Sequence, residues 1–323
     1  MVLLILEEDA IRTLADVDAA RQVVKDAFHA LQRGRATLPG VISIPFAASE
    51  GVAHIKAGHL HDDPTWTVKV SADFQPGDGL PTHHSGMMLV ISSVDGSLVG
   101  VLRDNGFLTE LRTGAAGAVA ADLLARTDAR TVAIIGAGSQ ARFQLQALRR
   151  IRPIESVRVA SRSPERAQAF VDEIASGSRL SARLFDSVEE AVRDADVVVT
   201  TTQSTSPLVR AEWLAPGVHV TAVGSDEPTK WELDPDVLRR ADVIAVDDRD
   251  QASRFGELHH ALDAGVVDTQ RIVTLGELID GAAVGRTGAE QVTVADLTGV
   301  GVQDAAIAGF IVTAAGRGTQ ESG

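Results

Sequence analysis

Residues Thr131–Ala141 read TVAIIGAGSQA, and this stretch decides the fold. The β-branched apolar run Val132–Ile135 predicts a buried strand that ends abruptly at the first glycine. The residues after this strand have the G-x-G-x-x-G/A form of the dinucleotide-binding fingerprint. Gly136 permits the tight turn, Gly138 lets a pyrophosphate approach the backbone, and Ala141 lets helix and strand pack closely. A helix beginning here would direct its free N–H groups at the phosphates, so we predict a Rossmann unit.

The end of the next predicted strand, Ser156–Ala160, decides which nicotinamide cofactor is bound. NAD-binding proteins place an acidic residue there to accept a hydrogen bond from the ribose 2′-hydroxyl, whereas this chain has Ser161-Arg162-Ser163. Hydroxyl donors and a guanidinium suit a 2′-phosphate, so NAD(P) binding is expected, with NADP(H) favoured over NAD. The alternative is that Arg162 stacks on the adenine. The predicted cofactor contacts are Gly136, Gly138, Ser139, Gln140, Ala141, Ser161, Arg162, Ser163, Thr113 and Val223.

The composition is that of an ordinary globular enzyme. The chain has 323 residues, of which 45% are hydrophobic and 23% charged, and this length allows two domains. A net charge of −14 argues against nucleic-acid or anionic membrane partners. The absence of cysteine excludes disulfides, thiolate metal sites and a cysteine nucleophile. The N-terminal apolar run is too short for a membrane span and lacks a basic flank, so we expect a cytoplasmic protein.

The pattern along the chain predicts two domains, one of them discontinuous. Residues 113–301 alternate strands and helices, and their apolar runs are typical of a parallel sheet covered on both faces. Residues 1–112 are expected to be α+β, with an amphipathic helix at Asp16–Arg33. Strands are predicted there at Val2–Leu6, Val41–Ile44, Val52–Gly58, Thr65–Ser71, Gly86–Ser92 and Ser97–Leu102. A last helix, Gly301–Gly316, is expected to return to this first domain, so residues 302–323 complete it.

Five blocks of sequence, one of which is the fingerprint, together form a wider pattern. They are Val68-Lys69-Val70, DNGFLTELRT at Asp104–Thr113, the fingerprint at Gly136, VGSDEPTKWELD at Val223–Asp234 and DLTGVGVQD at Asp296–Asp304. In combination they resemble the ornithine cyclodeaminase/μ-crystallin family over nearly the whole chain. With Lys56-Ala57-Gly58, the version here is most similar to the ectoine-utilisation cyclodeaminase-like branch. The resemblance implies a Rossmann domain, a second domain that forms a homodimer through an intersubunit sheet, a nicotinamide cofactor and an amino- or imino-acid substrate.

Two cationic residues are candidates for binding a substrate carboxylate. Lys69 lies in an apolar strand, where an inward-facing lysine needs a counter-charge or a ligand. The resemblance implies that it contacts the substrate carboxylate and helps to polarise the reacting carbon. The guanidinium of Arg112, at the opening of a predicted helix, suits a carboxylate bidentately. Two alternatives stay open: Lys69 points outward, or Arg112 forms a structural ion pair between the domains.

Asp226 is, together with Lys69, a candidate catalytic residue. It follows a predicted strand, and loops after the carboxyl ends of parallel strands line the ligand crevice of such folds. A carboxylate there can move a proton on the substrate nitrogen or activate water. The resemblance implies that it is the catalytic acid/base, and the alternative is a turn or N-cap aspartate ahead of Pro228.

Two departures from the family pattern bear on the substrate. Leu38-Pro39-Gly40 stands where ornithine-binding members carry an arginine, and Lys56 stands where they carry a glutamate. A cation at residue 56 has the wrong sign for the ammonium of ornithine and suits an acidic group or a second carboxylate. Thr82 matches a polar position on the substrate side, and His54 is a further candidate contact.

The resulting hypothesis is an enzyme that exchanges hydride between nicotinamide C4 and the α-carbon of an amino or imino acid. We favour an imine or keto-acid reductase or amino-acid dehydrogenase. One alternative is a cyclodeaminase that uses NAD catalytically, and another is a non-catalytic NADPH-binding protein similar to μ-crystallin. His59 and His61 alternate, but no third ligand at metal spacing accompanies them, so no metal is expected. Asp304 is expected to begin a helix.

Overall fold

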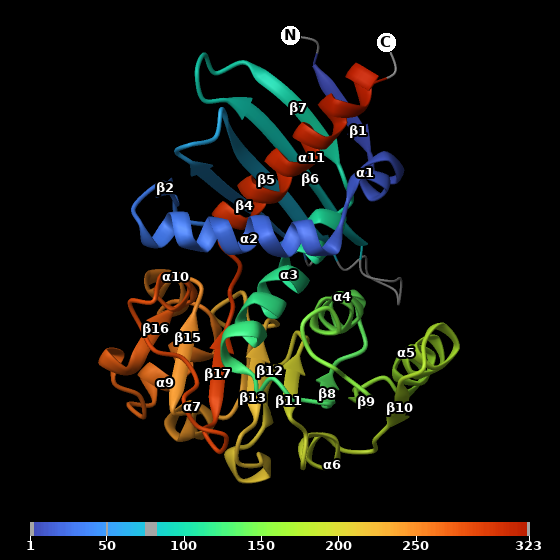
Figure 1. Ribbon diagram of the computed structural model, residues 1–323, viewed down its shortest axis with the longest axis vertical. Coiled ribbons are helices and arrows are strands. Elements are labelled where there is room, and N and C mark those ends of the chain that lie inside the picture. The colour runs from blue at the N-terminus through green and yellow to red at the C-terminus, as the bar shows by residue number, and fades with distance from the viewer. Residues whose placement is uncertain (1–2, 50, 75–82, 322–323) are drawn as a thin grey trace. The chain divides into compact units, whose positions relative to one another are not determined.

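The computed structural model describes residues 3–49, 51–74 and 83–321 (Figure 1). The chain forms two compact units. One contains Met1–Arg112 and Val300–Gly323, and the other contains Thr113–Gly299. Within the described residues, no helix is both long and apolar enough to cross a membrane.

The unit of residues 113–299 is built on a parallel sheet of eight strands, in agreement with the apolar runs of its sequence. The strand order is β10-β9-β8-β11-β13-β17-β15-β16, and every neighbouring pair is parallel. The strands are β8 (Thr131–Ile135), β9 (Ser156–Ala160), β10 (Ser181–Leu184), β11 (Val197–Thr200), β13 (His219–Ala222), β15 (Val243–Val246), β16 (Ile272–Thr274) and β17 (Thr293–Asp296). The order reverses between β8 and β11, which is where doubly wound sheets bind nucleotides.

Both faces of this sheet are buried, because successive side chains of a strand point to opposite faces and an apolar cluster lies on each face. Val132 and Ile134 of β8 pack into one apolar cluster, whereas Ala133 and Ile135 pack into the other. The helices of this unit are α4 (Ser139–Leu148), α5 (Pro164–Gly177), α6 (Val188–Val192), α7 (Pro235–Arg240), α8 (Arg249–Ala252), α9 (Gly256–Asp263) and α10 (Leu275–Asp280). A separate two-stranded sheet pairs β12 (Thr205–Val209) with β14 (Trp231–Leu233).

The other unit has a mixed sheet in the order β1-β7-β6-β5-β4-β2, with β3 also paired to β4. Its strands are β1 (Leu4–Glu7), β2 (Ala36–Thr37), β3 (Ile42–Phe46), β4 (Gly51–Leu60), β5 (Thr65–Phe74), β6 (His83–Ser92) and β7 (Leu98–Arg103). Its helices are α1 (Glu8–Leu14), α2 (Val17–Gln32) and α11 (Gly301–Glu321). Helix α11 contacts β4, β5 and β6 as well as α2, so these two helices cover one face of the sheet (Figure 1).

Helix α3 (Phe107–Leu124) differs from its predicted bounds. We expected the helix to begin at Arg112, but it begins five residues earlier. The reason is a side-chain cap, because Asp104 Oδ2 accepts a hydrogen bond from Leu108 N at 2.8 Å. Arg112 therefore lies inside the helix, in its second turn.

Candidate active site

The fingerprint turn has the geometry of a phosphate-binding loop. Gly136 has a φ of +113°, and its N–H donates to Ala160 O at 2.9 Å. A Cβ on Gly136 would lie 2.6 Å from Thr201 Oγ1, so the position requires glycine. A Cβ on Gly138, in contrast, would have no atom within 4 Å, and this residue is exposed at the start of α4. The open space beside a helix N-terminus fits the pyrophosphate of a dinucleotide.

Side chains from the same unit hold this loop in place. The Arg142 guanidinium donates to Ala137 O and Gly138 O, both at 3.1 Å, and to Glu173 at 2.7 Å. Ala141 is fully buried, which is the close helix–strand packing that the fingerprint predicts. Two other predicted cofactor residues are linked through one side chain, because Gln144 Nε2 donates to both Thr113 O and Gln140 Oε1.

The segment after β9 contains an exposed arginine and a serine that is already hydrogen-bonded within the protein. Arg162 is exposed and Ser161 is partly buried. Ser163 caps α5: its hydroxyl oxygen accepts from Arg166 N at 3.4 Å, and its O–H group donates to Glu165 Oε2 at 3.0 Å. Among the three predicted 2′-phosphate contacts, Ser163 thus already has a structural role, and a carboxylate lies beside it.

Asp226 lies in the loop that follows β13. Its side chain is 42% exposed, and Oδ1 lies 2.6 Å from Lys230 Nζ. The same Nζ lies 3.4 Å from Glu227 Oε1. Burial would lower the pKa of Lys230, but the two carboxylates outweigh burial and raise it. Asp226 caps no helix of the described residues, so the N-cap alternative is wrong. Val223 begins this loop, with its N–H bonded to Thr200 O.

In the other unit, Lys69 and Arg112 converge on one carboxylate. Lys69 Nζ lies 3.2 Å from Asp304 Oδ1, and Arg112 Nε donates to the same oxygen at 3.0 Å. Lys69 is 2% exposed, so the outward-facing alternative is wrong. Arg112 also donates to Gln303 Oε1 at 2.9 Å, and both of its partners belong to its own unit. Asp304 lies in the first turn of α11, as expected. Its carboxylate is also the counter-ion of two buried cations, which was not predicted from the sequence.

The electrostatics of this cluster favour an anionic ligand. Burial lowers the pKa of Lys69 to about 7, with Arg112 and Lys56 acting in the same direction against Asp304. Burial alone would raise the pKa of Asp304, but Lys69, Arg112 and Lys56 together lower it. Lys56 is buried and lies directly opposite Lys69 in the β4–β5 register. Three cations lie around the ionised Asp304, and burial raises the pKa of the other carboxyl group nearby, Asp104, so the cluster suits an incoming carboxylate.

Several buried polar atoms of this cluster have no hydrogen-bond partner among the described residues. They are Asp304 Oδ2, Gln303 Nε2 and Asp104 Oδ1. Burial raises the pKa of Asp104, whose other oxygen caps α3. Native proteins rarely leave buried polar atoms unsatisfied, so these atoms indicate a polar ligand or water at this place. Sequence reasoning missed Gln303 and Asp104, although both lie within the blocks that carry the resemblance.

The structure does not assign a role to the remaining candidate residues. His54 is buried on β4, and its Nδ1 lies 3.0 Å from Ser43 Oγ. Thr82 lies outside the described residues. The rings of His59 and His61 are 5.5 Å apart, and no group of three potential metal ligands occurs in the part of the chain that the structure describes.

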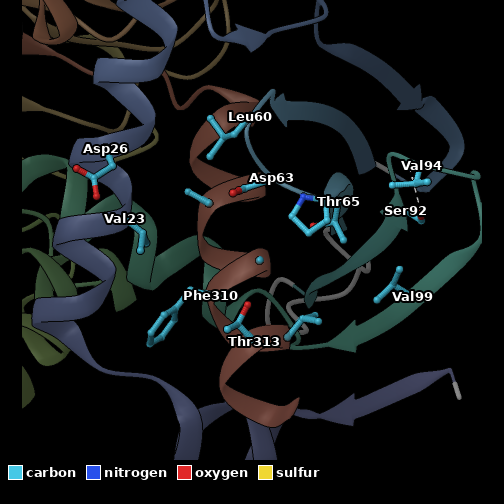
Figure 2. Close-up of a pocket in the computed structure, with 14 residues that line it drawn as sticks. Val23, Asp26, Leu60, Asp63, Thr65, Ser92, Val94, Val99, Phe310 and Thr313 are labelled. Atoms are coloured by element: carbon cyan, nitrogen blue, oxygen red, sulfur yellow. Dashed lines mark hydrogen bonds between the residues drawn. The ribbon is translucent and has the colours of Figure 1, made fainter. Parts of the chain in front are cut away.

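A hollow of about 580 Å³ lies elsewhere in the unit of Met1–Arg112 and Val300–Gly323 (Figure 2). Side chains of α2, α11, the β4–β5 turn and the β6–β7 turn line it, among them Val23, Asp63, Val94 and Phe310. None of the predicted site residues is in its lining, so this hollow is distinct from the cluster around Lys69.

The chain is similar to known proteins over nearly its whole length, in sequence and in structure. The sequence profile of the ornithine cyclodeaminase/mu-crystallin family matches residues 1–318. The protein named "uncharacterized cyclodeaminase y4tK" of Sinorhizobium fredii is 41% identical over 309 residues, which are 94% of this chain and 93% of that protein. A solved archaeal alanine dehydrogenase dimer with bound NAD is 36% identical, with a TM-score of 0.91 over 99% of this chain and 98% of that one. The Δ1-pyrroline-2-carboxylate reductase of Thermococcus litoralis, solved with NADH and L-proline, is 27% identical, with a TM-score of 0.91 over 98% of each chain.

Proposed function

The chain belongs to the ornithine cyclodeaminase/mu-crystallin family, and from this premise we propose that it is an NAD(P)-dependent oxidoreductase acting on a small amino or imino acid. Hydride would pass between nicotinamide C4 and the α-carbon, with net reduction of an imine or keto acid. The observation that carries this proposal is the buried cluster of Lys69, Arg112 and Asp304 with its unpartnered polar atoms. The alanine dehydrogenase and pyrroline-carboxylate reductase relatives are named for substrates of this class.

Each candidate residue has a proposed role in this reaction. Lys69 and Arg112 bind the substrate carboxylate, and Asp304 orients both cations. Asp226 delivers or accepts the proton at the substrate nitrogen, and Lys230 stabilises its carboxylate form between turnovers. The dinucleotide is held at the Gly136–Ala141 turn, and when bound it supplies or accepts the hydride.

The experiment that tests this function follows nicotinamide absorbance with purified protein and a substrate panel. The panel contains 2-keto acids with ammonia, cyclic imines, diamino acids and, because of Lys56, keto dicarboxylates. Steady oxidation of the reduced cofactor with one of these substrates is the expected result. No change in absorbance with any of them would contradict the proposal.

A cyclodeaminase is the second candidate, because a relative that is 41% identical carries that name. In such a reaction the hydride returns to the substrate, so ammonia appears without net change in nicotinamide absorbance. Lys56 counts against a diamino substrate, since its charge repels a side-chain ammonium. Ammonia release from a diamino acid at catalytic cofactor concentration would decide for this candidate.

We propose that NADP(H) is the preferred cofactor, because Arg162 is exposed at the end of β9 and no acidic residue occupies the strand end itself. Relatives have been solved with NAD or NADH, so the preference rests on this one position. The variant Arg162→Ala is expected to weaken NADPH binding roughly 10-fold and to leave NADH binding within twofold, since a charge-assisted contact to phosphate is lost. Cofactor fluorescence titration measures both constants.

Arg166→Ala is the matched control for that prediction, because Arg166 is an exposed arginine of the first turn of α5. It should leave the ratio of NADPH to NADH affinity unchanged. If Arg162→Ala weakens both cofactors equally, the arginine stacks on the adenine and selects neither.

We also propose a homodimer that forms through the uncovered face of the β1–β7 sheet. Met88 and Val90 of β6 are fully buried on the side of α11, whereas Met87, pointing the other way, is 43% exposed. Exposed apolar side chains of β3 extend this face, namely Ile42, Ile44 and Phe46. Apolar area of this kind marks an interaction surface, and a solved relative is a dimer.

The double variant Ile44→Glu/Met87→Glu is expected to convert the dimer into a monomer, because buried unpaired carboxylates are costly in an interface. Size-exclusion chromatography with light scattering measures the mass. Val284→Glu, a change at a 72% exposed residue of the other unit, is the control and should leave the mass unchanged. A wild-type mass near the 33.9 kDa of one chain would refute the proposed dimer.

A further inference from the structure

Two buried glutamates, Glu232 and Glu257, accept hydrogen bonds from the loop that carries Asp226. Glu232, on β14, is fully buried, and its carboxylate joins the ends of two neighbouring strands. Its Oε2 accepts from Thr200 Oγ1 at 2.7 Å and from Gly224 N at 2.9 Å, and its Oε1 accepts from Thr202 N at 2.5 Å. One side chain thus fixes the loop after β11 and the loop after β13 together.

Glu257, on α9, holds the first glutamate and the same loop. Its Oε1 accepts from Glu232 N at 2.9 Å and from the Ser225 hydroxyl, and its Oε2 accepts from Leu233 N at 2.7 Å. Helix α9 is itself anchored to the central sheet, because Asp296 Oδ2 at the end of β17 accepts from Leu258 N at 2.8 Å. The residues on the N-terminal side of Asp226 are therefore held by two carboxylates: Gly224 through its amide and Ser225 through its hydroxyl.

This arrangement is costly for stability. Glu232 and Glu257 form no ion pair with a lysine or arginine of the described residues, and each raises the electrostatic cost of the other. Burial raises the pKa of both, and for Glu257 the neighbouring Glu232 and Asp296 add to the effect. Apolar side chains of similar volume would avoid this cost but would leave buried N–H donors without an acceptor. The two carboxylates are therefore tied to the backbone groups that they hold, and two of these groups, Gly224 N and the Ser225 hydroxyl, lie in the loop of Asp226.

We infer that Glu232 and Glu257 are positioning residues that hold the Gly224–Asp226 backbone so that the Asp226 carboxylate is fixed for proton transfer. The inference rests on the proposed role of Asp226 as acid/base. Proton transfer requires heavy atoms within hydrogen-bond distance, so a loop displaced by about 1 Å would lose much of the rate. Substrate and cofactor binding do not need this placement.

The test uses Glu232→Gln and Ser225→Ala in the full-length protein loaded with cofactor. Both variants are expected to lower kcat roughly 10- to 100-fold, with KM and the cofactor dissociation constant within about twofold of wild type. Hydrogen exchange at the Gly224 amide is expected to accelerate at least about 10-fold in Glu232→Gln. Exchange is measured without turnover, so it reports on the loop even if the substrate is not found.

Asp196→Asn is the matched control. Asp196 also ties strand ends together, accepting from Arg130 N and Thr131 N at 2.8 and 2.9 Å, but at the opposite, amino edge of the same sheet. It should alter neither kcat nor the exchange of the Gly224 amide.

The possible outcomes separate the two proposals. Unchanged exchange at Gly224 in Glu232→Gln overturns the inference whatever the activity, and so does a wild-type kcat in both variants. Equal losses in kcat and cofactor affinity would mean a purely structural role and also overturn it. An inactive wild-type protein would refute the proposed function, while the exchange result would still decide whether the glutamates hold the loop.

Discussion

Replacing Asp226 with asparagine is expected to lower kcat by roughly 10²- to 10⁴-fold, the range associated with losing a general acid or base. Asparagine keeps the shape of the side chain but cannot give or take the proton at the substrate nitrogen. The contact with Lys230 would persist as a hydrogen bond from its ammonium to the neutral amide oxygen. Cofactor binding should remain within about twofold of wild type, since the dinucleotide is proposed to bind at the Gly136 turn.

The neighbouring Glu227 provides a matched control for this prediction. It contacts the same lysine at 3.4 Å, so Glu227→Gln removes an equal charge from the same ion-pair group. This variant should retain activity within a few-fold. Steady-state oxidation of the reduced cofactor and cofactor fluorescence measure the two effects separately. Full activity of Asp226→Asn would remove the argument for a catalytic carboxylate, and equal losses in both variants would assign the effect to Lys230.

The second large effect is expected for Lys69→Met. The methionine fills a similar volume but removes a buried cation that is proposed to bind the substrate carboxylate. A hydrogen bond to a charged group contributes about 1.5–3 kcal/mol, so kcat/KM should fall roughly 10- to 150-fold. Asp304 keeps Arg112 as its partner at 3.0 Å, and the fold should therefore persist. Thermal unfolding measured beside the kinetics checks that the loss is not one of folded protein.

The same residue predicts how activity depends on pH. Burial lowers the pKa of Lys69 to about 7, so the free protein loses this positive charge as the pH rises through neutrality. Since kcat/KM reports ionisations of the free enzyme, it should decline above about pH 7 in wild type. That decline should be absent in Lys69→Met, which has no proton to lose. An unchanged alkaline limb in the variant would assign the ionisation to another group.

Much of the nucleotide-binding unit could be predicted because its signals are local. The run of Val132–Ile135 followed by glycine defines a strand and its turn within a few residues, and β8 and β9 agree with prediction to within one residue. Strand β17 was missed, although it is central in the sheet. It is only four residues long and includes Thr293 and Asp296, both buried, so its polarity concealed it.

The candidate site could be predicted only in part, because its key contacts join distant residues. Arg112 and Asp304 are 192 positions apart, and their pairing depends on α11 lying against the sheet. An aspartate in the first turn of a helix is ordinary, and nothing near Asp304 in the sequence indicates that it faces two buried cations. Glu232 and Glu257 were missed for a similar reason, since isolated glutamates normally occupy the surface.

The two glycines of the nucleotide loop are under different kinds of constraint. The backbone of Gly136 has a positive φ and has no room for a side chain, whereas Gly138 has a φ of −81° and open space where a Cβ would be. Selection for folding alone would thus retain glycine at residue 136 but would allow other residues at position 138. In descendants of this fold that had lost the dinucleotide, residue 138 would be among the first of the loop to drift, which makes it a marker for the loss of nucleotide binding during evolution.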